Sequence, residues 1–321
     1  MRGEWVKRAC VFRTNPLALA PFGSCRSRRS APLPSRRNSS LCPFSPASTT
    51  NDRPSRTAAQ LRTRPVMSLS TSTVSEVVQQ ARGIFSKRKP SKELSLKDVQ
   101  ALLQALGQVT VSQVGLAKQA EEERKKTSAN PVKLPFLDRY TKREPITYFH
   151  IYECADFTVG IFCIPKGESM PIHDHPDMTV CSKVLYGKVH VEAYDKAPDL
   201  QDRLELDPAQ VLAARQVTDT VVSEDSEAFA LFCESNNIHR FSAVESCAIL
   251  DVLGPPYDSE EGREIAYYRK MLLKELGAEQ GNAGPAAAAN GDNGDVVVLQ
   301  KVNPPSDYVV EGREYTGEQV K

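Results

Sequence analysis

Several features that mark common classes of protein are scarce in this chain. It has one tryptophan and five histidines in 321 residues, and its formal net charge is only +1. No apolar run approaches the roughly 18 residues that a membrane-spanning helix needs. None of the eight cysteines belongs to a Cys-x-x-Cys pair. We therefore expect no membrane span, no disulfide framework and no cysteine-ligated zinc site.

The near-neutral total hides an uneven distribution of charge. Residues 1–70 contain thirteen Lys and Arg and two acids; subtracting these from the totals of 41 and 40 leaves 28 basic and 38 acidic residues. Such an acidic body argues against a general nucleic-acid binder. The first 70 residues are also rich in Ser and Pro and lack hydrophobic periodicity. We expect a disordered leader there, which is either an organellar transit peptide or a segment ahead of a true start at Met67.

Two helices and then many short strands are expected after the leader. Apolar residues recur at helical spacing over 73–85 and 95–107, and Ser95 with Asp98 three residues later can cap the second helix. From residue 146 onward, short stretches rich in Val, Ile, Tyr, Phe and Thr predict strands at 146–152, 156–164, 178–186, 188–194, 217–223, 228–233 and 246–253. This spacing is typical of a β-sandwich or jelly-roll barrel, with a hairpin turn at Gly187.

The C-terminal part divides into three expected segments. Residues 267–276 predict a helix that closes the barrel domain, which we place at 71–278. Residues 279–295, rich in Gly, Ala and Asn, predict a flexible linker. Residues 296–321 are expected to supply final strands that pack on the barrel, at Val296–Leu299 and Tyr308–Tyr315.

The densest chemical signal is a pair of histidines one residue apart. On an extended strand, His173 and His175 point to the same side and can bind one metal ion. Gly167 and Gly187 frame them in the spacing of the first cupin motif, G-x5-H-x-H-x4-E-x6-G. Val180 replaces the glutamate of that motif, which removes a carboxylate ligand. The protein ligands of a metal here are therefore expected to be neutral histidines.

A third ligand is expected from a later strand that faces the first two. His239 lies at the start of such a strand, whereas His150 and His190 fall inside alternating strands and are interpreted as structural. Three neutral imidazoles suit zinc, iron or copper alike. Zinc would indicate hydrolytic or hydration chemistry, and Fe(II) would leave open positions for a substrate and dioxygen. The spacing alone does not choose between these metals.

The chain from about Ile146 to Tyr268 resembles plant cysteine oxidases and cysteamine dioxygenase, the thiol dioxygenases that act on N-terminal cysteine. The matching blocks, in order, are ITYFHIYEC at 146–154, IFCIP at 161–165, PIHDHPDMTV at 171–180, SKVLYG at 182–187, VHV at 189–191 and DVLGPPY at 251–257. One position departs from the pattern. Some members carry Cys two residues before Tyr267 and form a Cys–Tyr crosslink there; Ile265 excludes this crosslink.

The resemblance implies a mainly β cupin fold, a double-stranded β-helix, that holds Fe(II) through His173, His175 and His239. It also implies roles close to the metal for Asp251 and Tyr257. Asp251 is expected to accept a hydrogen bond from a metal-bound histidine or the substrate amine, and Tyr257 to donate to bound oxygen or the sulfinate product. The alternatives are that Asp251 caps a turn and that Tyr257 is a packing aromatic. Asp174 is expected to point away from the metal and to be structural.

The activity implied by the resemblance is addition of both atoms of O2 to the thiol of an N-terminal cysteine, giving cysteine sulfinic acid. The protein would act as a monomeric oxygen sensor that feeds the N-degron pathway, with Cys-initiated proteins such as group VII ethylene response factors as partners and no nucleic acid or membrane. The resemblance implies cytoplasm and nucleus, and the leader favours a plastid or mitochondrion instead. The alternatives are a small-thiol dioxygenase for cysteine or cysteamine, a non-catalytic cupin binding module and, more weakly, a zinc enzyme.

Overall fold

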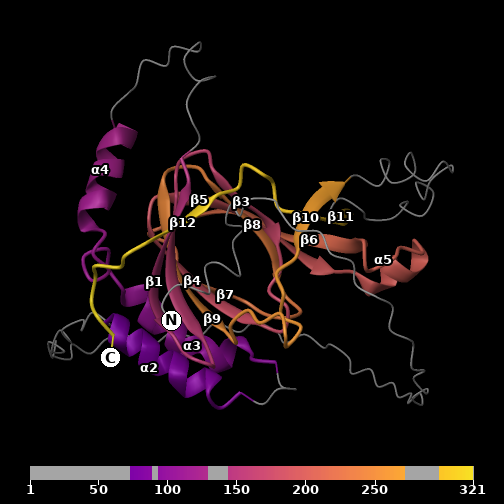
Figure 1. Ribbon diagram of the computed structural model, residues 1–321, viewed down its shortest axis with the longest axis horizontal. Coiled ribbons are helices and arrows are strands. Elements are labelled where there is room, and N and C mark those ends of the chain that lie inside the picture. The colour runs from indigo at the N-terminus through magenta and orange to yellow at the C-terminus, as the bar shows by residue number, and fades with distance from the viewer. Residues whose placement is uncertain (1–72, 89–92, 129–143, 272–295, 321) are drawn as a thin grey trace, which may run out of the picture. The chain divides into compact units, whose positions relative to one another are not determined.

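Two β-sheets are the main regular structure of the described chain, which comprises residues 73–88, 93–128, 144–271 and 296–320 of a computed structural model (Figure 1). The predictions of a leader at 1–70 and of a linker at 279–295 lie outside these residues. Within them, the expected mainly β fold with helices ahead of it is confirmed.

The two sheets differ in whether they close. The first is open, with the strand order β12-β1-β2-β9-β4-β7, and the second closes into a barrel in the order β10-β11-β6-β5-β8-β3. The first sheet consists of β1 (Ile146–Glu153), β2 (Thr158–Ile164), β4 (Thr179–Tyr186), β7 (Phe229–Leu231), β9 (Cys247–Gly254) and β12 (Val310–Arg313). The second consists of β3 (Ser169–His173), β5 (Lys188–Lys196), β6 (Val211–Ser223), β8 (Ile238–Ala243), β10 (Tyr267–Met271) and β11 (Val296–Val302). Because successive strands repeatedly cross between the sheets, the arrangement is that of a double-stranded β-helix, the cupin fold.

The first sheet is covered on both of its faces, so its central strands are buried along their whole length. In β2, Ile161 and Cys163 belong to a core shared with the helices. Phe162 and Ile164, which point the other way, belong to a core shared with β5 and β8 of the second sheet. A strand buried on both faces has a nearly continuous apolar sequence, which explains the runs seen in β2, β4 and β9.

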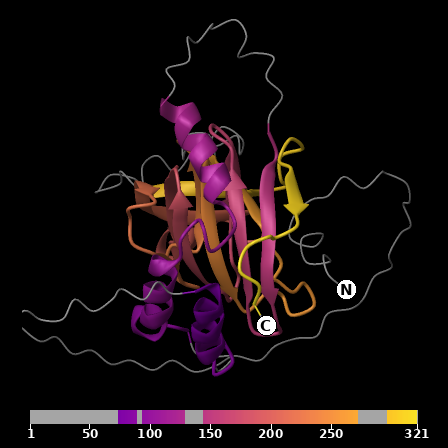
Figure 2. The same ribbon diagram turned by 90° about the vertical axis from the view of Figure 1, so that its left-hand side faces the viewer.

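The helices are α2 (Val74–Phe85), α3 (Leu96–Gln108), α4 (Ala117–Ser128) and α5 (Pro198–Arg203). The first two confirm the helices predicted from periodicity. In α2, Thr73 Oγ1 accepts from the backbone N–H of Glu76 (3.2 Å), and at the start of α3 the carboxylate of Asp98 accepts from the backbone N–H of Ser95 (2.9 Å). Figures 1 and 2 show α2 and α3 lying side by side at the first sheet. Their apolar residues pack in one core with Ile161 and Cys163 of β2. No helix in the described ranges is long and apolar enough to span a membrane.

One prediction about the C-terminal part is wrong. Residues 267–271 form strand β10 and not the beginning of a helix; the rest of the predicted helix, 272–276, lies outside the described residues. This segment has good helix formers, but β10 pairs on one side with β11 and on the other with β3. Ladder hydrogen bonds on both edges override a weak local propensity. The predicted final strands exist as β11 in the barrel and β12 beside β1.

Candidate metal centre

Two neighbouring strands of the barrel bring the predicted metal ligands together. His173 ends β3, and it lies directly opposite His239 of β8 in the antiparallel register. His175 follows β3 in a turn and does not lie within the strand, as the alternation argument had assumed. Its backbone N–H donates to Asn237 Oδ1 (2.9 Å), and its carbonyl accepts from Asn237 Nδ2 (2.8 Å). Asn237 therefore ties the turn that carries His175 to the strand that carries His239.

Sequence reasoning did not single out Asn237. Its only signal is its place two residues before His239, and nothing in the local sequence says that its side chain reaches a backbone 62 residues away. The amide is buried, and both of its polar ends are occupied by His175. A carboxylate could make only the accepting hydrogen bond, and an apolar residue could make neither. The position therefore requires a side chain that both donates and accepts.

The three imidazoles form a compact and buried cluster. Their ring centroids lie 4.6 Å apart for His173 and His239, and 5.0 Å apart for each pair that includes His175. One ring nitrogen from each histidine lies within 4.8 Å of the other two, and no ring is more than 6% exposed. A single divalent ion at the centre of this cluster would be within reach of all three rings.

Hydrogen bonds on the outer side of each ring select which nitrogen faces the cluster. Nδ1 of His173 lies 2.8 Å from the carbonyl oxygen of Pro171, and Nδ1 of His239 lies 3.3 Å from that of Asn237. Nδ1 of His175 lies 2.5 Å from the hydroxyl of Tyr257. A carbonyl oxygen only accepts, so Nδ1 carries the proton and Nε2 keeps its lone pair for a metal.

The environment of the rings favours their neutral form. Burial lowers the pKa of His173, although the Pro171 carbonyl and Asp174 act in the opposite direction. Burial also holds the pKa of His175 and His239 well below the usual value, and the neighbouring histidines lower it further. A metal ligand must be unprotonated, so this cluster is prepared for an ion at neutral pH.

A cavity of about 40 Å³ adjoins the cluster. Its lining is largely apolar and includes Phe162, Met170, Phe241 and Val180, the residue that replaces the glutamate of the motif. Among the described residues that line it, Asp251 is the only carboxylic acid. The three histidines could thus hold an ion with no negatively charged protein ligand, which fits a neutral three-histidine centre.

Asp251 lies in β9, and the first sheet places its side chain at this cavity. Its Oδ1 accepts a hydrogen bond from the hydroxyl of Ser182 (2.6 Å), which is its register partner on β4. No hydrogen bond to a histidine of the cluster is found, so the other expected partner, the substrate amine, stays a prediction. Burial raises the pKa of Asp251 to about 7, with the Ser182 hydrogen bond acting in the opposite direction. The carboxyl therefore exchanges a proton near neutral pH.

Tyr257 contacts a metal-ligand candidate directly. Its hydroxyl donates to the carbonyl of Asp174 (2.9 Å) and so accepts from Nδ1 of His175. This contact differs from the expected role as a donor to bound oxygen, because it fixes the ring of His175. The carboxylate of Asp174 points elsewhere, as predicted, and accepts from the backbone N–H of Ala266 and the hydroxyl of Tyr268, both at 2.8 Å.

The two other histidines lie away from the cluster, as predicted. Nε2 of His150 lies 3.8 Å from the carboxylate of Glu153, and Nε2 of His190 lies 2.6 Å from that of Asp219. Ile265 lines the cavity close to Tyr267, at the place where a crosslinking cysteine would stand. The described part of the cavity therefore contains no thiol.

The geometry agrees with what comparison with known proteins finds. A family model described as PCO_ADO matches residues 105–320, which include every strand of both sheets. The chain belongs to this family. It is thus a member of the thiol dioxygenases that include plant cysteine oxidase and cysteamine dioxygenase, and the prediction of a dioxygenase enzyme is confirmed at that level.

Individual relatives are similar over most of the chain. Plant cysteine oxidase 1 of Arabidopsis thaliana is 31% identical over 239 residues, which cover 74% of this chain and 77% of that protein. The 2-aminoethanethiol dioxygenase of Homo sapiens is 34% identical over 192 residues, covering 55% of this chain and 68% of that protein. A solved structure with a double-stranded β-helix domain from Klebsiella pneumoniae covers 44% of this chain and 97% of its own, at 12% identity and a TM-score of 0.27. That likeness is too remote to add to the description of the fold.

Proposed function

We propose that this protein is an Fe(II)-dependent dioxygenase that oxidises the N-terminal cysteine of target proteins to cysteine sulfinic acid. The observation that carries the proposal is the buried cluster of His173, His175 and His239, with neutral rings and no carboxylate ligand. The donor set fits iron, because imidazole is a common iron ligand and three rings would leave positions for a substrate and dioxygen. Fe(II), when bound there, would supply the Lewis acidity that favours a thiolate and the electrons with which dioxygen reacts.

The residues around the cluster have distinct tasks in this proposal. Tyr257 holds His175 in the tautomer that presents Nε2 to the cavity. The pKa of Asp251 lies close to neutral pH, so its carboxyl can accept a hydrogen bond or a proton from the amine or thiol of the entering cysteine. The apolar lining excludes water and holds sulfur and oxygen together. The reaction R–SH + O2 → R–SO2H is balanced without a further reductant.

We further propose that the protein acts as an oxygen sensor. Its product would mark target proteins for arginylation and degradation through the N-degron pathway, with group VII ethylene response factors or similar Cys-initiated proteins as targets. The relative named plant cysteine oxidase 1 supports a cysteine-bearing substrate.

A second candidate is a dioxygenase for a free aminothiol such as cysteamine. It is favoured by the relatives named 2-aminoethanethiol dioxygenase, which are 34% identical to this chain in Homo sapiens and in Mus musculus. A non-catalytic cupin is less well supported, because a binding module has no need of three converging, neutral histidines.

The test compares a Cys-initiated peptide with cysteamine on the iron-loaded protein. The peptide is expected to gain the mass of two oxygen atoms, and isotopically labelled dioxygen is expected to supply both. Turnover of cysteamine without oxidation of the peptide would support the second candidate. If neither thiol is oxidised although iron is bound in a one-to-one ratio, a binding module is the remaining interpretation.

A further inference from the structure

A large groove adjoins the metal cavity at two tyrosines. The groove has a volume of about 1020 Å³, and Tyr267 and Tyr308 are the two residues that line both it and the smaller cavity. Their ring centroids lie 6.1 Å apart, and the ring of Tyr267 lies 6.4 Å from that of His173. The tyrosine pair therefore forms the boundary between the metal centre and the groove.

The metal cavity and the groove would hold different parts of a peptide substrate. A cavity of about 40 Å³ holds a few water-sized atoms, enough for the sulfur of a cysteine and its nearest neighbours. The residues that follow the cysteine must lie beyond the cavity. The groove past Tyr267 and Tyr308 is large enough for several of them, since ligand sites of this kind commonly measure about 300–1,000 Å³.

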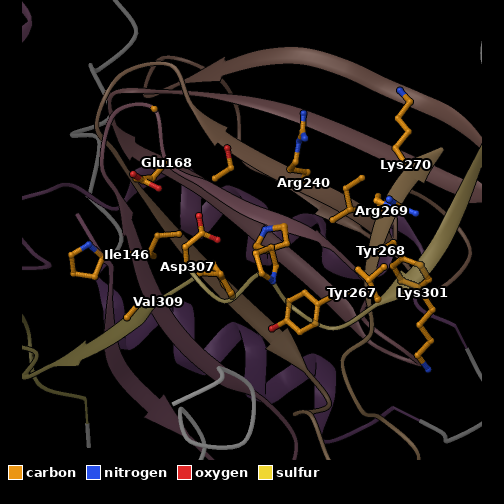
Figure 3. A pocket seen from close by; sticks show the side chains of 18 of the residues that line it. Ile146, Glu168, Arg240, Tyr267, Tyr268, Arg269, Lys270, Lys301, Asp307 and Val309 are labelled. Atoms are coloured by element: carbon orange, nitrogen blue, oxygen red, sulfur yellow. The ribbon is translucent and has the colours of Figure 1, made fainter. Parts of the chain in front are cut away.

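Charge is distributed unevenly along this groove. Figure 3 shows Glu168 and Asp307 on one side and Arg269, Lys270 and Lys301 on the other. The three cations come from the paired strands β10 and β11, where Lys301 lies opposite Tyr268 and Arg269 lies opposite Gln300. The basic side thus begins next to the tyrosine boundary and continues away from the metal.

Two of the three basic side chains have neutral partners. Arg269 donates to Gln300 Oε1 (2.6 Å), and Lys270 donates to Gln216 Oε1 (2.8 Å). No salt bridge joins Arg269, Lys270 or Lys301 to a carboxylate within the described ranges.

Arg269 and Lys301 carry the larger uncompensated charge. Lys270 is in the field of Asp219, whose pKa is lowered first by His190 and also by Lys270. Glu311, which also lines the groove, lies 3.9 Å from Arg313. In a chain whose residues after position 70 are acidic overall, an exposed basic pair of this kind offers a site for carboxylates.

We propose that this groove binds the residues that follow the N-terminal cysteine, and that Arg269 and Lys301 select acidic residues among them. The inference rests on the proposed function and adds a substrate class to it. Tyr267 and Arg269 lie two positions apart on β10, a separation of about 7 Å along an extended strand. Acidic residues at the third to fifth positions of a peptide would therefore lie near Arg269, and Lys301 lines the same groove.

The test compares two peptides that share the sequence Cys-Gly-Gly and continue with either Glu-Glu or Lys-Lys. The ratio of kcat/KM for the acidic and basic peptides is measured in one preparation, so that iron loading and protein stability cancel. An exposed ion pair contributes about 0.2–1 kcal/mol, and two such pairs predict an acidic preference of about two- to thirtyfold. The preference is expected to shrink as salt is raised, because exposed charges are screened.

A charge-reversal variant and a matched control identify the residues responsible. The double variant Arg269→Glu and Lys301→Glu is expected to invert the ratio. The control is Lys97→Glu and Lys118→Glu, which reverses the same number of exposed charges on α3 and α4 and is expected to leave the ratio as in the unmodified protein. Fluorescent Ser-initiated versions of both peptides, titrated in the absence of iron, should show the same order of Kd.

The outcomes separate this inference from the proposed function. Equal kcat/KM and equal Kd for the two peptides, or a preference for the basic one, overturns the role of Arg269 and Lys301 while peptide oxidation still stands. Oxidation of cysteamine with no oxidation of either peptide overturns both. An acidic preference that the control variant removes as fully as the groove variant assigns the effect to net charge and also overturns the inference.

Discussion

The contact between Tyr257 and His175 predicts a measurable change in metal affinity. The substitution Tyr257→Phe keeps the ring and removes the hydroxyl, which is 2.5 Å from His175 Nδ1 and 2.9 Å from the carbonyl of Asp174. His175 then loses the acceptor that fixes its tautomer and orientation. Metal affinity should fall, because a misoriented ring binds an ion less well.

The structure limits the size of this fall. Loss of an outer hydrogen bond to a metal-binding histidine typically costs about 10–100-fold in metal affinity. Removing the hydroxyl would leave a space beside the cavity that Tyr257 lines, and a water molecule there could replace part of the lost hydrogen bonding to Nδ1. We therefore expect the lower end of the range, about tenfold, which corresponds to about 1.4 kcal/mol. The metal-free protein should lose a similar amount of stability, about 1 kcal/mol.

The assay is anaerobic competition for Fe(II) with a chelator of known affinity, together with urea unfolding of the metal-free protein. Tyr268→Phe is the matched control, since it removes a phenolic hydroxyl that also donates to Asp174 but contacts no histidine of the cluster. That variant should lose stability and keep the Fe(II) affinity within about twofold. The reasoning is refuted if Tyr257→Phe binds Fe(II) as tightly as the unmodified protein, or if both variants weaken binding equally.

Four other predictions address single features of the chain. Burial raises the pKa of Asp251 from 3.8 to about 7, so its contribution to the stability of the metal-free protein is fully present below pH 3.8 and is lost as the pH rises through 7. In urea unfolding across that range, the free energy of unfolding of Asp251→Asn should therefore fall less with pH than that of the unmodified protein. His239→Ala should abolish stoichiometric iron binding in metal analysis, whereas His190→Ala should retain it. Glu318 accepts from the first backbone N–H groups of α2, so Glu318→Gln should lower the free energy of unfolding by about 1 kcal/mol; an unchanged urea midpoint would contradict this. Fluorescent fusions of the full chain and of a chain that starts at Met67 should differ in location if the leader is a transit peptide, with the longer one in a plastid or mitochondrion and the shorter one in cytoplasm and nucleus.

The sequence by itself identified the three histidines that cluster in the structure and the elements with strong local patterns. Gly167 and Gly187 identified the histidine pair because the spacing of the motif can be read from the sequence alone. In the structure, Gly187 has a positive φ of 76° between β4 and β5, in the left-handed region that glycine adopts without strain. Helices α2 and α3 were predictable because their apolar residues follow the helical repeat and their caps lie within three residues. The missing glutamate at Val180 predicted a site without a carboxylate ligand, and the structure brings the three predicted histidines together.

Only the tertiary structure decided how these parts work together. β10 became a strand because its partners β3 and β11 occupy both of its edges, and those partners are far away in the sequence. Asn237 and Tyr257 hold the turn and the ring of His175 across 62 and 82 residues. The groove likewise forms where β10 and β11 pair beside the metal cavity. Local sequence specifies which side chains are present and which faces are apolar, whereas hydrogen bonds and cavities of this kind exist only after the barrel has closed.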